Sequence, residues 1–110
     1  MRTIQSFVRR AGRLTPGQAR ARQEGLPHYG LPETGALAPV VLLPLQTAWV
    51  LEIGFGNGES LLAQAQLAPE VGFFGIEVHP PGVGRLLAGV AAAQLRNVRV
   101  WEGDVVPLLH

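Results

Sequence analysis

The chain of 110 residues contains no cysteine and no lysine, which limits the kinds of protein it can be. Without cysteine, it can form neither disulfides nor thiolate metal sites. No apolar run approaches the ~20 residues that a transmembrane helix requires. The first arginines are not followed by the apolar stretch of a secretory signal, so we expect a cytoplasmic location and no membrane partner. With 47% hydrophobic residues, the chain can bury the core of one domain.

All nine basic residues are arginines, and most of them lie near the N-terminus. Residues 1–32 hold six arginines and one acid, a net charge of +5, whereas residues 33–110 hold three arginines and seven acids, a net charge of −4. A basic arm on an acidic domain indicates a polyanionic partner. Arginine suits phosphate because its planar fork donates two parallel hydrogen bonds. The composition of the genome would by itself also explain the exclusive use of arginine.

The N-terminal half has only one clear signal for a helix. Thr15, followed by a proline, a glycine and Gln18, predicts a helix start with Thr15 as N-cap and Gln18 completing a capping box. We expect this helix to end at Gly25 and, since it has almost no apolar face, to be held weakly at the surface. Residues 26–48 are rich in proline and glycine, which predicts a linker with a short extended piece at residues 40–43.

From residue 48 onward, apolar strand-like runs alternate with helical patterns. This alternation predicts an α/β fold, a Rossmann-like doubly wound parallel sheet limited to about its first three strands. The expected strands are 49–53, 72–78 and 98–101, the expected helices are 60–68 and 84–94, and residues 80–82 form a turn. We therefore expect residues 1–47 to be a basic arm and linker, and residues 48–110 to be the first half of a cofactor domain. The first strand would then present an open apolar edge, which predicts self-association.

The first strand leads directly into a turn that contains three glycines. Gly54, Gly56 and Gly58 occupy every second position after it, and such a turn lets a ligand approach bare backbone. The dinucleotide fingerprint needs three residues from its second glycine to its third, and this chain has two, which disfavours an NAD-dependent oxidoreductase. The tighter spacing, with Glu52 two residues before the first glycine, resembles motif I of class I S-adenosylmethionine-dependent methyltransferases.

Two further acids follow later strands. Glu77 ends the second strand, where a carboxylate can accept hydrogen bonds from both ribose hydroxyls of a nucleoside, and Asp104 follows the third, where it could accept from an adenine amino group. Because parallel strands end at one edge of a sheet, Glu52, Glu77 and Asp104 are expected to share that edge with the glycine turn. Taken singly, each could also be a merely solvated acid.

Three blocks of sequence resemble the bacterial tRNA (guanine-N7-)-methyltransferase family, in the same order and over nearly all of the chain. They are residues 6–18, residues 51–60 and residues 75–84. The resemblance implies transfer of a methyl group from S-adenosylmethionine to N7 of guanine, at position 46 in the variable loop of tRNA. Carried over by position, it implies that Glu52, Glu77 and Asp104 contact S-adenosylmethionine while Gly54 and Gly56 make the turn.

Family members are about twice as long, and their active-site aspartate corresponds to a segment beyond residue 110. The resemblance therefore implies no catalytic residue in this chain, which we expect to be a fragment that is inactive alone. Arg9, Arg10 and Arg13 are the candidate tRNA-binding residues. The alternative is a non-catalytic module that retains affinity for the cofactor or for RNA.

Guanine N7 has a free lone pair, so the implied reaction needs no general base. His79 is accordingly expected to position a loop, and the three scattered histidines predict no metal site.

Overall fold

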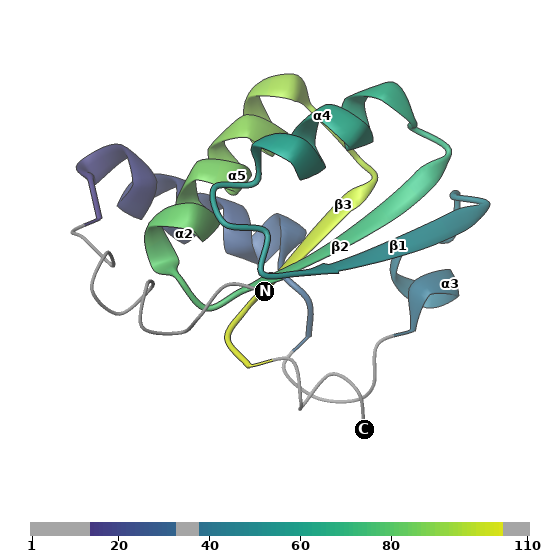
Figure 1. Ribbon diagram of the computed structural model, residues 1–110, viewed down its shortest axis with the longest axis horizontal. Helices are drawn as coiled ribbons and strands as arrows, with labels where there is room; N and C mark the ends of the chain where they lie inside the picture. The colour runs from purple at the N-terminus through teal and green to yellow at the C-terminus, as the bar shows by residue number, and fades with distance from the viewer. Residues whose placement is uncertain (1–13, 33–37, 105–110) are drawn as a thin grey trace.

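A three-stranded parallel sheet lies beneath a layer of helices in the computed structural model, which describes residues 14–32 and 38–104 (Figure 1). In chain order, the elements are α2 (Pro16–Tyr29), α3 (Pro39–Leu42), β1 (Ala48–Ile53), α4 (Glu59–Leu67), β2 (Val71–Glu77), α5 (Pro80–Ala93) and β3 (Val98–Glu102). The sheet order is β1-β2-β3, and both pairs of strands are parallel. The predicted α/β architecture is thus confirmed.

Each face of the sheet has its own apolar core. On one face, Phe73, Val98 and Val100 pack against Leu61 of α4 and against the buried side of α5. The other face holds a smaller cluster, to which the two tryptophans contribute; its members are Leu31, Leu43, Phe74 and Ile76, with Leu42, Trp49 and Trp101 packed against them. The helices α2, α4 and α5 therefore form one layer, and α3 lies on the opposite side (Figure 1).

Helix α2 begins as the sequence predicts but ends later and is held more firmly. The Thr15 hydroxyl accepts from the Gln18 backbone N–H at 3.1 Å, and the Gln18 side chain accepts from the Thr15 N–H at 3.0 Å. The expected end at Gly25 is wrong, because the helix continues to Tyr29. Gly25 is buried against α5, where an added Cβ would lie 3.1 Å from Leu87 Cβ. It serves close helix packing rather than helix termination.

Two further local expectations are wrong. Residues 39–42 form the short helix α3 instead of an extended piece. Residues 80–82 form the first turn of α5, with prolines at its first positions, instead of a separate turn. In both places proline starts a helix, because its fixed φ suits the first turn and its missing N–H would have no intrahelical partner there.

The two edges of the sheet differ. Beside β3, the Leu31 N–H donates to the Val100 carbonyl at 2.9 Å, so the segment after α2 partly covers that edge. Among residues 14–32 and 38–104, β1 has a strand neighbour on one side only. Its Val50, Leu51 and Ile53 side chains are 42%, 39% and 59% exposed. The open apolar edge expected of the first strand is therefore present in the part of the chain that the structure describes.

Candidate cofactor site

The link from β1 to α4 is a turn whose glycines adopt a left-handed backbone. Gly54, Gly56 and Gly58 have φ angles of 76°, 66° and 78°. Side chains rarely tolerate this region, so the alternation of glycine follows from the path of the chain. The Gly54 N–H donates to the Ile76 carbonyl at 2.7 Å, which fixes the start of the turn to the end of β2.

The first turn of α5 lies directly against this glycine turn. A Cβ added at Gly82 would fall 2.0 Å from the Gly56 carbonyl oxygen, closer than any side chain can approach. Gly82 therefore lets the backbones of two segments meet, and the first turn of α5 forms a rigid wall behind Gly56. The sequence suggested only ordinary turn chemistry for this glycine, and the contact with Gly56 is visible only in the fold.

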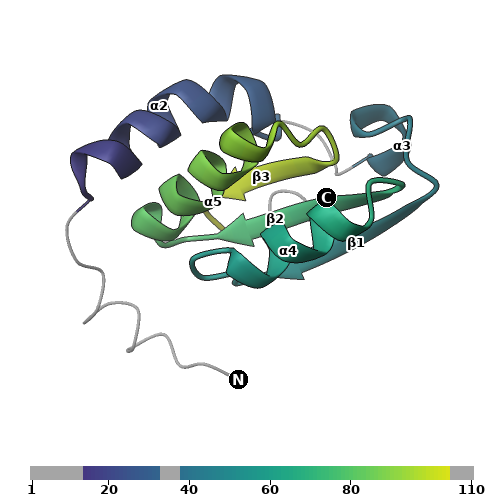
Figure 2. The same cartoon turned by 90° about the horizontal axis from the view of Figure 1, so that it is seen from above.

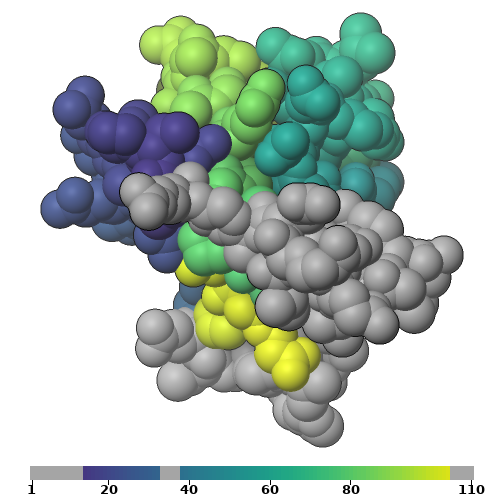
Figure 3. Space-filling view, turned by 60° about the vertical axis from the view of Figure 1, so that its left-hand side comes forward, coloured from purple at the N-terminus to yellow at the C-terminus, as the bar shows by residue number. Residues whose placement is uncertain are grey.

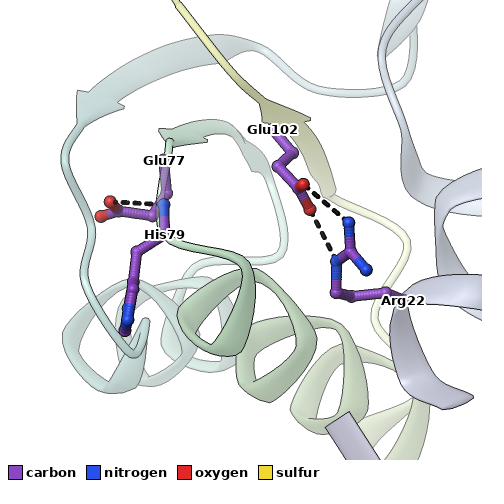
Figure 4. Close-up of polar contacts among 4 residues, drawn as sticks. All are labelled: Arg22, Glu77, His79 and Glu102. Carbon is purple, nitrogen blue, oxygen red and sulfur yellow. Dashed lines mark hydrogen bonds and ion pairs between the residues drawn. The ribbon is translucent and has the colours of Figure 1, made fainter. Parts of the chain in front are cut away.

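The Glu77 carboxylate, at the end of β2, holds the glycine turn from the other side. It is buried, with 2% of the residue exposed. Its Oε1 accepts from the Gly56 N–H at 2.6 Å, and its Oε2 accepts from the Val78 N–H at 3.0 Å. Oε2 also accepts from the His79 N–H at 3.2 Å (Figure 4). A carboxylate offers about four acceptor positions, so about one remains for a ligand. In this geometry the main role of Glu77 is to hold the glycine turn in place.

The structure brings the other two predicted acids to the same edge of the sheet. Glu52 pairs with Gly75, two residues before Glu77, so Glu52 and Glu77 extend from the same face of neighbouring strands. Asp104 is exposed and follows the end of β3 by two residues, and its backbone carbonyl accepts from Trp101 Nε1 at 2.7 Å. Three carboxylates thus lie at the edge of the sheet that carries the glycine turn, a set of acceptors that suits hydroxyl, amino and cationic groups of a ligand.

A fourth acid at this edge already has a cationic partner that sequence reasoning missed. Arg22 of α2 donates through Nε and Nη2 to the two carboxylate oxygens of Glu102, each at 2.7 Å (Figure 4). The hydrogen bond to Glu102 raises the pKa of Arg22, and partial burial opposes that rise. The two residues are 80 positions apart, so no local pattern could have paired them. The pair ties α2 to the end of β3, beside the site.

A double-mutant cycle on this pair should give a coupling free energy of about 1 kcal/mol. Both side chains are partly exposed, at 27% and 21%, which screens the interaction, while the two-bond geometry keeps it above the usual surface value. Urea unfolding of Arg22→Gln, Glu102→Gln and the double variant measures it. The expectation fails if the double variant loses as much free energy of unfolding as the two single variants lose together.

Of the remaining candidate residues, the structure describes His79 but not the three arginines. His79 is the N-cap of α5, and its backbone N–H binds Glu77; its imidazole Nε2 is buried and has no hydrogen-bond partner among the described residues. Arg9, Arg10 and Arg13 lie outside the described residues. Within residues 14–32 and 38–104, no group of side chains could hold a metal ion, and no helix is long and apolar enough to cross a membrane.

A solved structure shares the fold of this chain, and curated proteins match its sequence. The structure of PKMT2 from Rickettsia typhi in complex with AdoHcy superposes with a TM-score of 0.52 at 23% identity, over 87% of this chain and 16% of that one, which shows a shared fold. The tRNA (guanine-N(7)-)-methyltransferase of Nitrosococcus oceani is 50% identical over 99% of this chain and 47% of its own length. That of Pseudomonas savastanoi is 51% identical over 99% of this chain and 45% of its own length. The chain thus spans about half the length of these relatives.

A parallel sheet whose strand ends carry acids around a left-handed glycine turn defines a Rossmann-like cofactor-binding domain. The sequence model of a family described as "putative methyltransferase" matches residues 46–110. The chain belongs to this methyltransferase family.

Proposed function

We propose that the chain is the cofactor-binding half of a tRNA (guanine-N7-)-methyltransferase that uses S-adenosylmethionine. The observation that carries the proposal is about 50% identity to proteins of that name over 99% of this chain. The glycine turn and its three acids are consistent with it, since they offer bare backbone and carboxylate acceptors at one edge of the sheet. The cytoplasm, where tRNA is modified, is the location that the proposal implies.

The described residues fit S-adenosylmethionine with one restriction. Glu52 and Asp104 would accept from its amino groups or face its positive charge, and the turn at Gly54 and Gly56 would let it lie against backbone. Glu77 would accept one ribose hydroxyl on its remaining acceptor position, or give up Gly56 to accept two. When bound, the cofactor supplies a sulfonium methyl group that guanine N7 can take in line, so orientation matters more than acid–base chemistry.

Titration calorimetry with S-adenosylmethionine tests the proposal. We expect the parent chain to give a saturable heat and Glu52→Gln to weaken binding about tenfold. Glu70→Gln, an exposed acid at the opposite edge of the sheet, should bind as the parent does. No saturable heat from the folded parent would refute cofactor binding, and a heat with NADH instead would favour an oxidoreductase.

We expect residues 1–110 alone to transfer no methyl group, because the chain spans 47% or less of the relatives and the family aspartate corresponds to a position beyond residue 110. Incubation with tRNA and cofactor, followed by mass spectrometry of nucleosides, measures this. N7-methylguanosine made by this chain would overturn the expectation. A chain that binds the cofactor or RNA without any such product, even when joined to the remaining half of a relative, would instead be a non-catalytic module.

We propose that Arg9, Arg10 and Arg13 contact the tRNA backbone, as part of a basic arm and linker at residues 1–47 that precedes the cofactor domain at residues 48–110. The family match from residue 46 supports this division. Helix α2 starts at the carboxyl edge of the sheet, next to the first turn of α5 (Figure 3), so the preceding residues are attached beside the candidate site. Replacing the three arginines by glutamine should lower the slope of log affinity against log salt by about 2 to 3.

We further propose that the open edge of β1 mediates self-association. The exposed Val50, Leu51 and Ile53 on a strand with one described neighbour support this proposal. Light scattering of Val50→Lys should show a smaller mean mass than the parent at equal concentration. The proposal is contradicted if the parent chain is a folded monomer both at high concentration and after 100-fold dilution.

A further inference from the structure

A cavity of about 600 Å³ lies at the edge of the sheet opposite to the glycine turn. Its walls come from the end of α2, from α3 and the residues after it, from the end of α5 and from the start of β3. The strands begin at this edge and end at the other one, and seven residues of β2 span roughly 20 Å. In Figure 2, α3 and the end of α2 lie far from the start of α2, which lies at the carboxyl edge of the sheet. This cavity is therefore distinct from the candidate cofactor site.

The side chains of basic residues line this cavity. Arg96, Arg99 and His28 line it, and no aspartate or glutamate of the described residues does so. Arg99 is partly buried, and within the described residues the one hydrogen bond of its side chain runs from Nη1 to the Val98 carbonyl at 2.8 Å. Burial lowers the pKa of Arg99, and the nearby Tyr29 hydroxyl opposes this effect. Among residues 14–32 and 38–104, the only ion pair is Arg22–Glu102, so the positive charge in this cavity is not neutralised by a described carboxylate.

The other residues that line the cavity offer a surface on which a planar ring of a ligand can lie. Tyr29, Leu43 and Leu95 contribute aromatic and apolar surface, and the rings of His28 and Tyr29 lie 6.2 Å apart between centroids. Two guanidinium groups beside an aromatic wall combine the elements that bind nucleotides, a phosphate clamp and a surface for stacking a base.

A groove of about 390 Å³ between α2 and α5 leads away from the cavity. Groove and cavity share His28, Tyr29 and Ala91, so they adjoin one another. The groove reaches Gly17 and Arg20, near the start of α2, and it also contains one acid, Glu24. The groove thus extends along α2 from beside the cavity toward the carboxyl edge of the sheet.

We propose that this cavity binds the phosphate group of a nucleotide, with Arg96 and Arg99 donating to the phosphate and Tyr29 lying against the base. The phosphate can belong to a free mononucleotide or to one unit of an RNA strand, and both share the chemistry that the cavity recognises. The proposal does not rest on methyl transfer, so a failure of S-adenosylmethionine binding leaves it unaffected.

Two-dimensional NMR of the arginine Nε–H groups tests it, with 5′-AMP and a uridine octamer as separate ligands. We expect the Arg99 resonance to shift on titration, and Arg96→Gln combined with Arg99→Gln to weaken binding, followed through backbone amides, at least tenfold. Arg85→Gln removes an arginine from α5 that does not line the cavity, and it should change affinity less than twofold. An octamer that binds at least tenfold more tightly than 5′-AMP identifies an RNA strand as the source; comparable affinities identify the mononucleotide.

Two results would overturn the proposal. One is an Arg99 resonance that neither ligand moves, or a double variant that binds both ligands as the parent does. The other concerns Glu33, an acid outside the described residues. If Glu33→Gln alone, without ligand, shifts the Arg99 resonance, a carboxylate of this chain already occupies the cavity. The proposal instead requires Glu33→Gln to leave that resonance in place.

Discussion

Gly82→Ala is expected to destabilise the folded chain by about 3 kcal/mol, the upper end for overpacking a buried site. The new methyl group would lie 2.0 Å from the Gly56 carbonyl oxygen, and both the first turn of α5 and the glycine turn are backbone. Neither can yield by a simple change of rotamer. One of them must move, and the Gly56 N–H would then lose its alignment with Glu77. The midpoint of urea unfolding measures the loss, and calorimetry with S-adenosylmethionine should show weaker binding as well.

Gly17→Ala is the matched control for this substitution. Gly17 also lies in the first turn of a helix, but a Cβ added there would meet no atom of the described residues within 4 Å beyond its own helix backbone and chain neighbours. Alanine is the better helix former, so we expect a gain of up to about 1 kcal/mol. If both variants were equally stable, contact between α5 and the glycine turn would be loose in solution, and the proposed role of Gly82 as a close-approach residue would be wrong.

The elements that local patterns define were predictable from the sequence. The three strands, the capping box at Thr15 and the meeting of Glu52, Glu77 and Asp104 at one edge follow from alternation, cap chemistry and the geometry of parallel strands. The helix boundaries failed where tertiary contacts override local propensity. Gly25 looks like a helix terminus until Leu87 is seen packing against it.

The features of the site that depend on distant residues could not be predicted. The Arg22–Glu102 pair joins residues 80 positions apart, and the contact of Gly82 with Gly56 joins two different turns. Asn97 is buried, and its side-chain amide donates to the carbonyls of Ala65, Ala68 and Val71. Charge and glycine content identify such residues as unusual, but only the fold shows which partner each one has.

Glu77→Gln should have the largest effect on the candidate site. The carboxylate accepts three backbone N–H groups, whereas an amide presents one oxygen and one NH₂ group, so at least one N–H would face a donor. Hydrogen bonds to a charged acceptor contribute about 1.5–3 kcal/mol, and we expect unfolding to become easier by about 3 kcal/mol. Affinity for S-adenosylmethionine should fall at least 100-fold, because the same carboxylate would be needed both by the turn and by the ligand.

The amide proton of Gly56 separates these two roles of Glu77. At 2.6 Å from Oε1, the Gly56 nitrogen holds a proton that should resonate far downfield and exchange slowly in the parent chain, and Glu77→Gln should abolish both properties while the control Glu70→Gln keeps them. Adding the cofactor to the parent then distinguishes two ways of binding. A Gly56 proton that stays downfield means that Glu77 holds the turn and accepts one hydroxyl, whereas an upfield move means that the ligand displaces Gly56 from Glu77. A Gly56 proton that exchanges freely in the ligand-free parent would contradict the anchoring role, because the turn would then form only around its ligand.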